Sequence, residues 1–204
     1  MKRSLPDPIL GDLTRLDEMR SGGVKGNLMT SRIWYVRDRF GEKELQRIAA
    51  AVPAARAIVE KPPLPFVWCS FGDMIDVDRA ILEGPMGGDL EKMREFGGAI
   101  AKHDLPTLYK VLFKVGTPRF LMKRVGIVAA TYIRDSPMKG EDMSDGGVRV
   151  VQTGKTFPYY FCGFGVCGWF EAAIELSGGK NIRVVHSACR HRGAENCAWD
   201  NHWD

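Results

Sequence analysis

The chain has 204 residues, of which 45% are hydrophobic and 26% are charged, a composition typical of a globular protein with one sizeable core or two small ones. Its formal net charge is +4, but the basic residues alternate with acidic ones instead of forming a concentrated stripe, so we expect no direct nucleic-acid binding. No apolar run approaches the roughly 20 residues that span a bilayer, and the apolar stretch near the N-terminus is too short for a signal peptide, so we expect a cytoplasmic protein without a membrane segment.

The first 23 residues differ in composition and hydrophobic pattern from the rest of the chain. They contain two prolines and end in a pair of glycines, without sustained hydrophobic periodicity. We therefore expect a flexible arm over residues 1–23 and a single domain over residues 24–204.

Helical periodicity begins at Gly26. Apolar residues recur at helical spacing up to Gly41, while Arg32 takes another face, which predicts an amphipathic helix that ends at a glycine. Strong helix formers over 42–52 predict a second helix closed by Pro53, and three prolines within 61–65 predict an extended connector.

Further helices are predicted up to about residue 135. One ends near Leu82, and the aspartates at its start (Asp73, Asp76, Asp78) are explained by the helix dipole. Another covers 90–102, and two more begin where a capping side chain precedes a proline, at Asp104 and at Thr117.

The residue pattern of the second half of the chain is typical of β-strands. Short β-branched or aromatic runs predict strands at 148–151 and 157–161, a helix follows over 163–176, and the last strands are expected at 181–185 and 197–203. The sequence thus predicts an α+β chain in which a helical half precedes a β-β-α-β-β half.

Three of the five cysteines are spaced in a way that suits a metal site. Cys189 and Cys197 flank a polar turn, so a hairpin brings their thiols together, and Cys162 precedes the helix that leads into this hairpin. Histidines that can also bind zinc lie nearby in sequence: His186, His191 and His202. Reduced thiols packed as small apolar side chains, or a Cys189–Cys197 disulfide, are the alternatives that the spacing leaves open.

Evidence for catalysis is thin. The chain has no Gly-x-Ser-x-Gly elbow, no phosphate-binding glycine loop and no His-Glu-x-x-His motif. Cys167 near a helix N-terminus is a candidate reactive thiol, with a packing role as the alternative. Whether the protein is an enzyme stays open, and we expect that it is not.

The C-terminal half resembles a known family. Cys162 followed by GFGVCGWFEAAIELSGGKNIRVVHSACRHRGAENCAW is similar to the C-terminal half of 4-vinyl-reductase domains, whose pattern is a cysteine, a Gly-aromatic helix, a strand and C-x7-C. The stretch REFGGAIAKHDLPTLYKVLFKVGTPRFLMKR resembles the helical half of uncharacterised delta-proteobacterial proteins of this type. The resemblance covers residues 24–203.

This resemblance implies a fold and a metal site. The superfamily shares its fold with haem-dependent nitric oxide sensors and a TRAPP subunit: helices packed on a small antiparallel sheet, with a ligand pocket between them. In the phenol-sensing members, the two cysteines of C-x7-C, an acidic residue three positions earlier and an upstream cysteine bind zinc. Carried over by position, the zinc ligands here are Cys162, His186, Cys189 and Cys197.

Haem is not expected. The haem sensors clamp the propionates with a Tyr-x-Ser-x-Arg motif, of which only the fragment Tyr132-Ile133-Arg134 is present. His103 is the only histidine of the helical half, and its place near an expected helix end is typical of a capping or surface role.

The expected function follows from the resemblance. We expect a sensor or regulatory domain that binds a small hydrophobic or aromatic molecule, forms a homodimer and acts on an unidentified protein partner. The alternatives are an accessory enzyme of tetrapyrrole metabolism and a ligand-free, TRAPP-like adaptor. Small-molecule sites are mostly apolar, and the residues predicted to line the pocket are Trp34, Phe113, Tyr132, Tyr160, Phe164 and Trp169.

Overall fold

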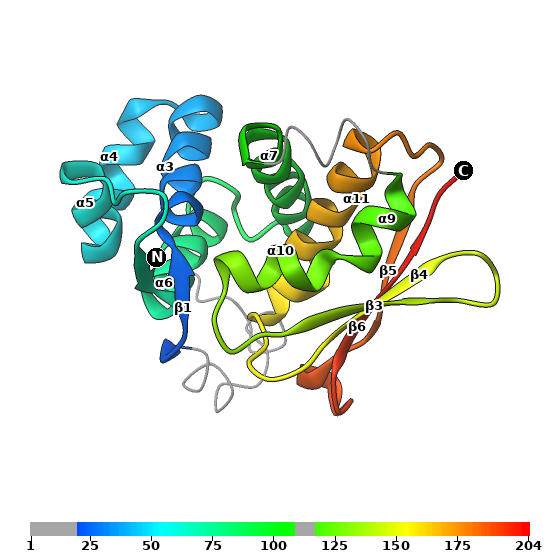
Figure 1. Ribbon diagram of the computed structural model, residues 1–204. Coiled ribbons are helices and arrows are strands. Elements are labelled where there is room, and N and C mark those ends of the chain that lie inside the picture. Colours follow the sequence, from blue (N-terminus) through cyan, green and yellow to red (C-terminus); the bar gives the residue numbers. More distant parts are fainter. Residues whose placement is uncertain (1–19, 109–116) are drawn as a thin grey trace.

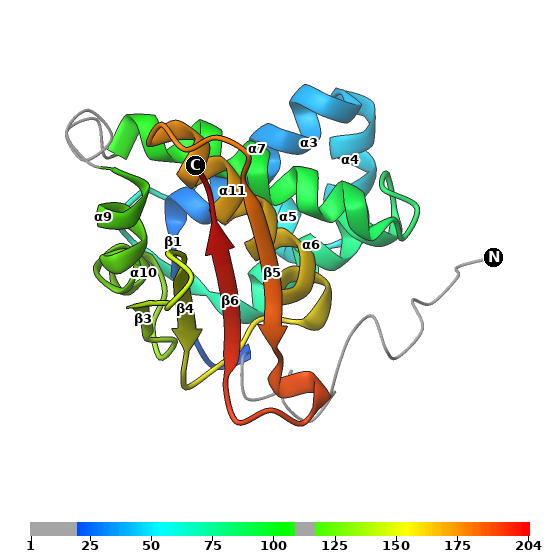
Figure 2. The same cartoon turned by 90° about the vertical axis from the view of Figure 1, so that its right-hand side faces the viewer.

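A computed structural model describes residues 20–108 and 117–204 (Figure 1). Helices dominate the first part of the chain, and a four-stranded antiparallel sheet with one long helix against it forms the second part (Figure 2). The predicted α+β class and the β-β-α-β-β order of the second half are confirmed, although the first two strands of that order are Met138–Asp142 and Val148–Gln152 instead of 148–151 and 157–161. None of the described helices is long and apolar enough to cross a membrane.

The helices lie in two groups. The first group gathers on the side away from the sheet (Figure 1): α3 (Gly26–Phe40), α4 (Glu42–Ala51), α5 (Pro53–Glu60) and α6 (Phe71–Glu83). The second group lies closer to the sheet: α7 (Leu90–Leu108), α9 (Pro118–Lys123), α10 (Val125–Tyr132) and α11 (Val166–Leu176). A two-stranded ribbon, β1 (Gly23–Lys25) and β2 (Trp68–Ser70), joins the start of α3 to the start of α6.

Two helix boundaries differ from the sequence-based expectation. Pro53 closes α4 as predicted, but it is also the first residue of α5. Proline is tolerated at this position because the amide groups of the first helical turn have no acceptor within the helix, so the missing amide hydrogen costs no hydrogen bond. Asp104 does not start a helix; it lies inside α7, where its carboxylate accepts hydrogen bonds from Ser31 (2.6 Å) and His103 (2.7 Å). The start expected at Thr117 is confirmed, since its side chain accepts a hydrogen bond from the Phe120 amide.

The sheet has the strand order β3-β4-β6-β5, with every neighbouring pair antiparallel. Its strands are β3 (Met138–Asp142), β4 (Val148–Gln152), β5 (Arg183–Ala188) and β6 (Cys197–His202). The strand predicted over 157–161 is wrong: this segment enters a π-helical turn, Phe161–Gly165, that continues directly into α11. Its aromatic side chains pack inward from a helical backbone, which a short apolar run does not distinguish from a strand.

A close helix contact joins α7 to the α11 segment through glycines. A Cβ atom on Gly97 would lie 1.9 Å from the carbonyl oxygen of Gly165, and one on Gly168 would lie 1.9 Å from the carbonyl oxygen of Arg94. Only glycine permits such an approach of two backbones. This contact, hereafter the glycine seam, fixes α11 and the turn before it against the helical half.

Candidate metal centre and adjoining cavity

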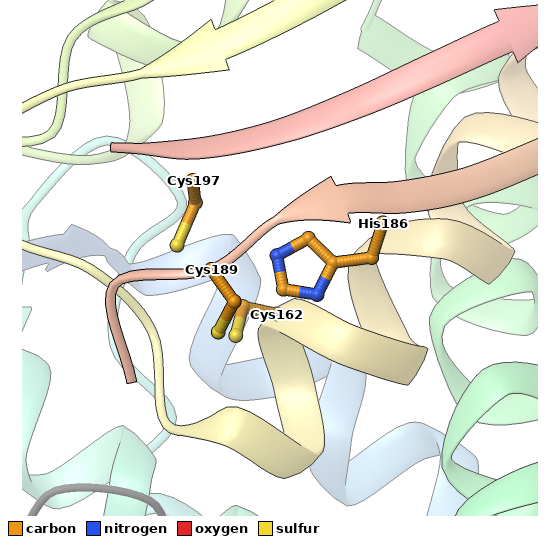
Figure 3. Close-up of side chains that lie close together, drawn as sticks. All are labelled: Cys162, His186, Cys189 and Cys197. Carbon is orange, nitrogen blue, oxygen red and sulfur yellow. The ribbon is translucent and has the colours of Figure 1, made fainter. Parts of the chain in front are cut away.

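The four residues predicted to bind zinc lie together at one end of the sheet. One ligand atom from each of Cys162, His186, Cys189 and Cys197 falls within 4.8 Å of all the others. Figure 3 shows the three sulfur atoms and the imidazole ring turned toward one another, although they come from the π-helical turn, from β5 and its hairpin, and from β6. Three thiols and one imidazole in this arrangement form a complete donor set for a tetrahedral metal ion.

A β-bulge explains how His186 and Cys189 reach the same place. Side chains alternate across a strand, so residues three apart normally face opposite sides of a sheet. The pairing of β5 with β6 shifts register between His186 and Ala188, which leaves one residue of β5 without a partner. The extra residue returns Cys189 to the side of the sheet on which His186 lies, opposite the start of β6 at Cys197.

The π-helical turn supplies the third sulfur. Cys162 is fully buried, and its carbonyl oxygen accepts a 2.8 Å hydrogen bond from the indole Nε1 of Trp199 in β6. This bond ties the turn to the middle of the sheet beside the cluster. The same indole stacks on the ring of His186, so one side chain contacts both of these ligand segments.

The surroundings of the cluster provide hydrogen-bond donors to one sulfur and leave one imidazole nitrogen without a partner among the described residues. Hydrogen bonds from the Cys162 and Cys189 thiols lower the pKa of Cys197, whereas burial raises the pKa of Cys162 well above its ordinary value. The Arg190 amide donates to the Cys197 sulfur at 3.4 Å, and the Thr156 hydroxyl lies 3.1 Å from it. The Nε2 atom of His186 is buried without a hydrogen-bond partner among the described residues. Such an orphaned nitrogen, facing three thiols, is explained if it binds a metal ion.

The remaining cysteines and histidines of this half lie outside the cluster. All five cysteines are free, so the Cys189–Cys197 disulfide is not formed. Burial raises the pKa of Cys167 to about 12, which fits the packing role and not a reactive thiol. His191 contacts the carbonyl oxygen of Phe157 at 2.7 Å, and His202 lies 3.9 Å from an Asp145 carboxylate oxygen.

An apolar cavity of about 90 Å³ lies between the helical half and the turn that carries Cys162. Of the six residues predicted to line a pocket, Tyr132 and Trp169 line this cavity. It is formed by residues of α3, α6, α7, α10, β3, the π-helical turn, α11 and the loops beside them: Leu28, Arg32, Met74, Ile100, Val125, Val128, Ala129, Tyr132, Ile133, Met138, Phe157, Phe161, Val166, Trp169 and Phe170.

The other predicted pocket residues lie elsewhere. Trp34 stacks on His103 at a centroid distance of 4.0 Å, along an open groove on the outside of α3 and α7. Tyr160 is buried and donates to the carbonyl oxygen of Ile75. Phe164 packs edge-on against Tyr159, and Phe113 lies outside the described residues.

Sequence reasoning missed the charged group of the cavity. Arg32, expected on a face away from the apolar stripe, is 2% exposed and forms a bidentate ion pair with Asp78, at 2.7 and 3.0 Å. Asp78 is therefore not explained by the helix dipole; its carboxylate neutralises a buried guanidinium. The pair joins α3 to α6, and a matching arginine and aspartate in two amphipathic helices were its only sequence signal.

The protein thus has helices packed on a small antiparallel sheet (Figures 1 and 2), and comparison with solved structures identifies this fold. An H-NOX protein from S. oneidensis in the Fe(II)NO ligation state is 14% identical with a TM-score of 0.70, over 88% of this chain and 99% of that chain. A mutant of an H-NOX protein from S. oneidensis in the Fe(II) ligation state is 13% identical with a TM-score of 0.71, over 88% and 96%. A mutant H-NOX protein from K. algicida is 11% identical with a TM-score of 0.63, over 88% and 96%.

No protein-family model matches the chain, and no curated protein matches it by sequence. At identities this low, the likeness concerns the fold alone. The haem-nitric-oxide-binding part of the expected resemblance is confirmed at that level: the chain has the fold of H-NOX proteins.

Proposed function

We propose that this protein is a ligand-binding regulatory domain in which a structural zinc ion, held by Cys162, His186, Cys189 and Cys197, fixes the wall of a small apolar cavity. The observation that carries the proposal is the convergence of these four side chains within 4.8 Å. The pattern that these residues share with 4-vinyl-reductase domains supports a relationship with that branch of the fold. Homodimer formation and a cytoplasmic location are further expectations from that resemblance.

Zinc is the metal that best matches the donor set. Thiolate and imidazole are its preferred ligands, and a closed set of four protein ligands is typical of a structural site. Bond lengths of about 2.0–2.3 Å in a tetrahedron place ligand atoms roughly 3.5–4 Å apart. A cluster whose atoms all lie within 4.8 Å needs only a slight contraction to reach that geometry.

The cavity lies close enough to the cluster for the two to be coupled. Phe170 lines the cavity and contacts Trp199 edge-on at a centroid distance of 5.7 Å, and Trp199 stacks on His186. Phe161 also lines the cavity and directly precedes Cys162. A ligand that shifts these aromatic rings therefore acts on the segments that hold the metal ion.

The described residues do not fit haem, the group whose distortion has been probed in the H-NOX family. A cavity of 150 Å³ holds a molecule the size of benzene, so a space of about 90 Å³ is far too small for a porphyrin. The described residues that line it include no histidine or cysteine to bind iron. His103 lies on α7 but stacks on Trp34 and bonds to Asp104 instead. We propose a ligand smaller than haem.

Native mass spectrometry of protein purified without chelator tests the zinc proposal. We expect one zinc ion per chain, and loss of both metal and stability in the Cys189→Ser/Cys197→Ser double variant, because metal-binding energy is part of the folding energy. Cys69→Ser is the matched control, since Cys69 is a free cysteine outside the cluster. Metal-free protein after zinc reconstitution, together with an unchanged melting temperature of the double variant, contradicts the proposal.

Haem is tested separately, by adding it to the purified protein and recording the absorption spectrum. We expect no Soret band of a protein-ligated haem. A stoichiometric complex would contradict our assignment of the cavity, without affecting the zinc proposal.

A further inference from the structure

Arg32 gives the cavity a chemical preference that its apolar walls alone do not have. It is the only charged side chain among the described residues that line the cavity, and it is 2% exposed. Removing a guanidinium from water is costly unless its charge is neutralised and its N–H groups find acceptors. The number of hydrogen-bond acceptors that the protein provides to Arg32 therefore determines how many acceptors a ligand in the cavity has to supply.

The protein neutralises the charge of Arg32 but does not provide an acceptor for every one of its N–H groups. The Nε and Nη2 atoms donate to Asp78, and Nη1 donates to the carbonyl oxygen of Leu28 at 2.7 Å. A guanidinium has five N–H groups, so two of them, one on each terminal nitrogen, have no acceptor among the described residues. The rings of Phe96 and Phe161 lie at 5.6 and 5.7 Å from the guanidinium carbon and offer no oxygen.

Three classes of small molecule meet these donors differently. A hydrocarbon leaves the two N–H groups without partners, and a carboxylate adds a second negative charge beside Asp78 to a site that the ion pair has already made neutral. A neutral molecule with a carbonyl-type oxygen supplies an acceptor without a charge. Its apolar part contacts the remaining lining, which includes Met74, Met138 and Trp169.

We propose that the cavity selects small neutral carbonyl compounds, such as short ketones or aldehydes, and that the free N–H groups of Arg32 donate to the carbonyl oxygen. The inference rests on the proposed ligand-binding function of the cavity. The volume of about 90 Å³ limits the ligand in this conformation to fewer atoms than benzene. A ligand with an aromatic ring needs side chains to move, and the two methionines of the lining are suited to such movement.

Three probes of nearly equal shape test this preference: butan-2-one, 2-methylbut-1-ene and propanoate. Their binding to the zinc-loaded protein is titrated through the methyl signals of Met74 and Met138, with Met93 as a buried methionine outside the cavity lining. We expect the ketone to bind at least about tenfold more tightly than the alkene or the carboxylate, and to shift the two cavity methionines and not Met93.

The variant arm replaces Arg32 and Asp78 together by leucine, because removing both charges keeps the site neutral where a single replacement leaves an unpaired charge. In this double variant we expect the alkene to bind as tightly as the ketone or more so. If the alkene binds the natural protein as tightly as the ketone does, the proposed role of Arg32 is overturned, while ligand binding by the cavity remains supported. If none of the probes shifts the methyl signals of Met74 or Met138, the proposal that the cavity binds a ligand is contradicted as well. The comparison in the natural protein decides the question even if the double variant does not fold.

Discussion

The imidazole of His186 lies almost parallel to the indole of Trp199, with ring centroids 5.1 Å apart and planes at 15°. The indole Nε1 donates to the carbonyl oxygen of Cys162, so Trp199 orients two of the four candidate metal ligands at once. Groups of this kind, which hold the ligands without touching the metal, strongly influence metal affinity.

Trp199→Phe is therefore expected to weaken zinc binding by about tenfold or more. The phenyl ring keeps an aromatic face against His186 but loses the hydrogen bond to Cys162. Competition with a chromophoric chelator measures the affinity. Trp203→Phe is the control, because Trp203 lies just beyond β6 and is only partly buried. Equal zinc affinity of the two variants would show that the hydrogen bond does not support the site.

The glycine seam predicts a large difference between two similar substitutions. Gly168→Ala places a methyl group 1.9 Å from the carbonyl oxygen of Arg94, and we expect a loss of at least about 1–3 kcal/mol in the free energy of unfolding. In Gly98→Ala the nearest atom lies at 3.3 Å, so the clash is mild and is offset by the higher helix propensity of alanine. Urea unfolding of the two variants measures the difference. Equal stabilities would mean that the backbones are not in contact.

The buried ion pair predicts opposite results for single and double replacement. Asp78→Ala leaves the Arg32 guanidinium buried without its counter-charge, and we expect a loss of about 3–5 kcal/mol in the free energy of unfolding. Arg32→Leu/Asp78→Leu removes both charges, so we expect a stability close to that of the natural protein. Chemical denaturation compares the three proteins. A double variant as unstable as Asp78→Ala would mean that packing, and not charge, dominates at this site.

The Arg149–Asp200 pair between β4 and β6 predicts a dependence of stability on pH. Hydrogen bonds from Arg149 lower the pKa of Asp200 in the folded state below its ordinary value. The pair therefore stabilises the fold fully above the unfolded pKa of about 3.9, and this contribution is lost as the pH falls through the lowered folded pKa. We expect Asp200→Asn to cost at most about 1 kcal/mol at pH 7.

The melting temperatures of this variant and the natural protein should converge in acid. Asp38→Asn is the control, because Asp38 is exposed and pairs with no cation among the described residues. A difference between Asp200→Asn and the natural protein that persists at the lowest pH would assign the effect to packing.

The sequence predicted the class of the fold because its two halves follow different periodicities. The helices over 26–41 and 42–52 match α3 and α4 within a residue, since glycine and proline mark their ends. Strand 148–151 is β4, but β3 was not predicted, because MKGED carries no β-branched residue. Local patterns fixed these elements, and a weak local pattern left β3 undetected.

The four clustered residues were predicted together from the resemblance, whereas only Tyr132 and Trp169 of the cavity lining were predicted, for different physical reasons. Cys189 and Cys197 are linked by a short hairpin, so sequence spacing limits their separation. The bulge that turns His186 toward them is a property of pairing with β6, which spacing does not reveal. The cavity draws on seven separate elements, which are α3, α6, α7, α10, β3, the π-helical turn and α11. A single helix pattern does not indicate that Arg32 is buried, because its counter-charge lies 46 residues away.

The glycine seam also limits how the molecule can respond to a ligand. Rotation of α7 or α11 about its own axis would drive a side chain into the gap that Gly97 and Gly168 keep free. The two helices are therefore restricted to moving together as one rigid body. Since α7 contributes Ile100 to the cavity and α11 contributes Phe170, these two walls keep their spacing, and any swelling of the cavity has to displace the other elements around it.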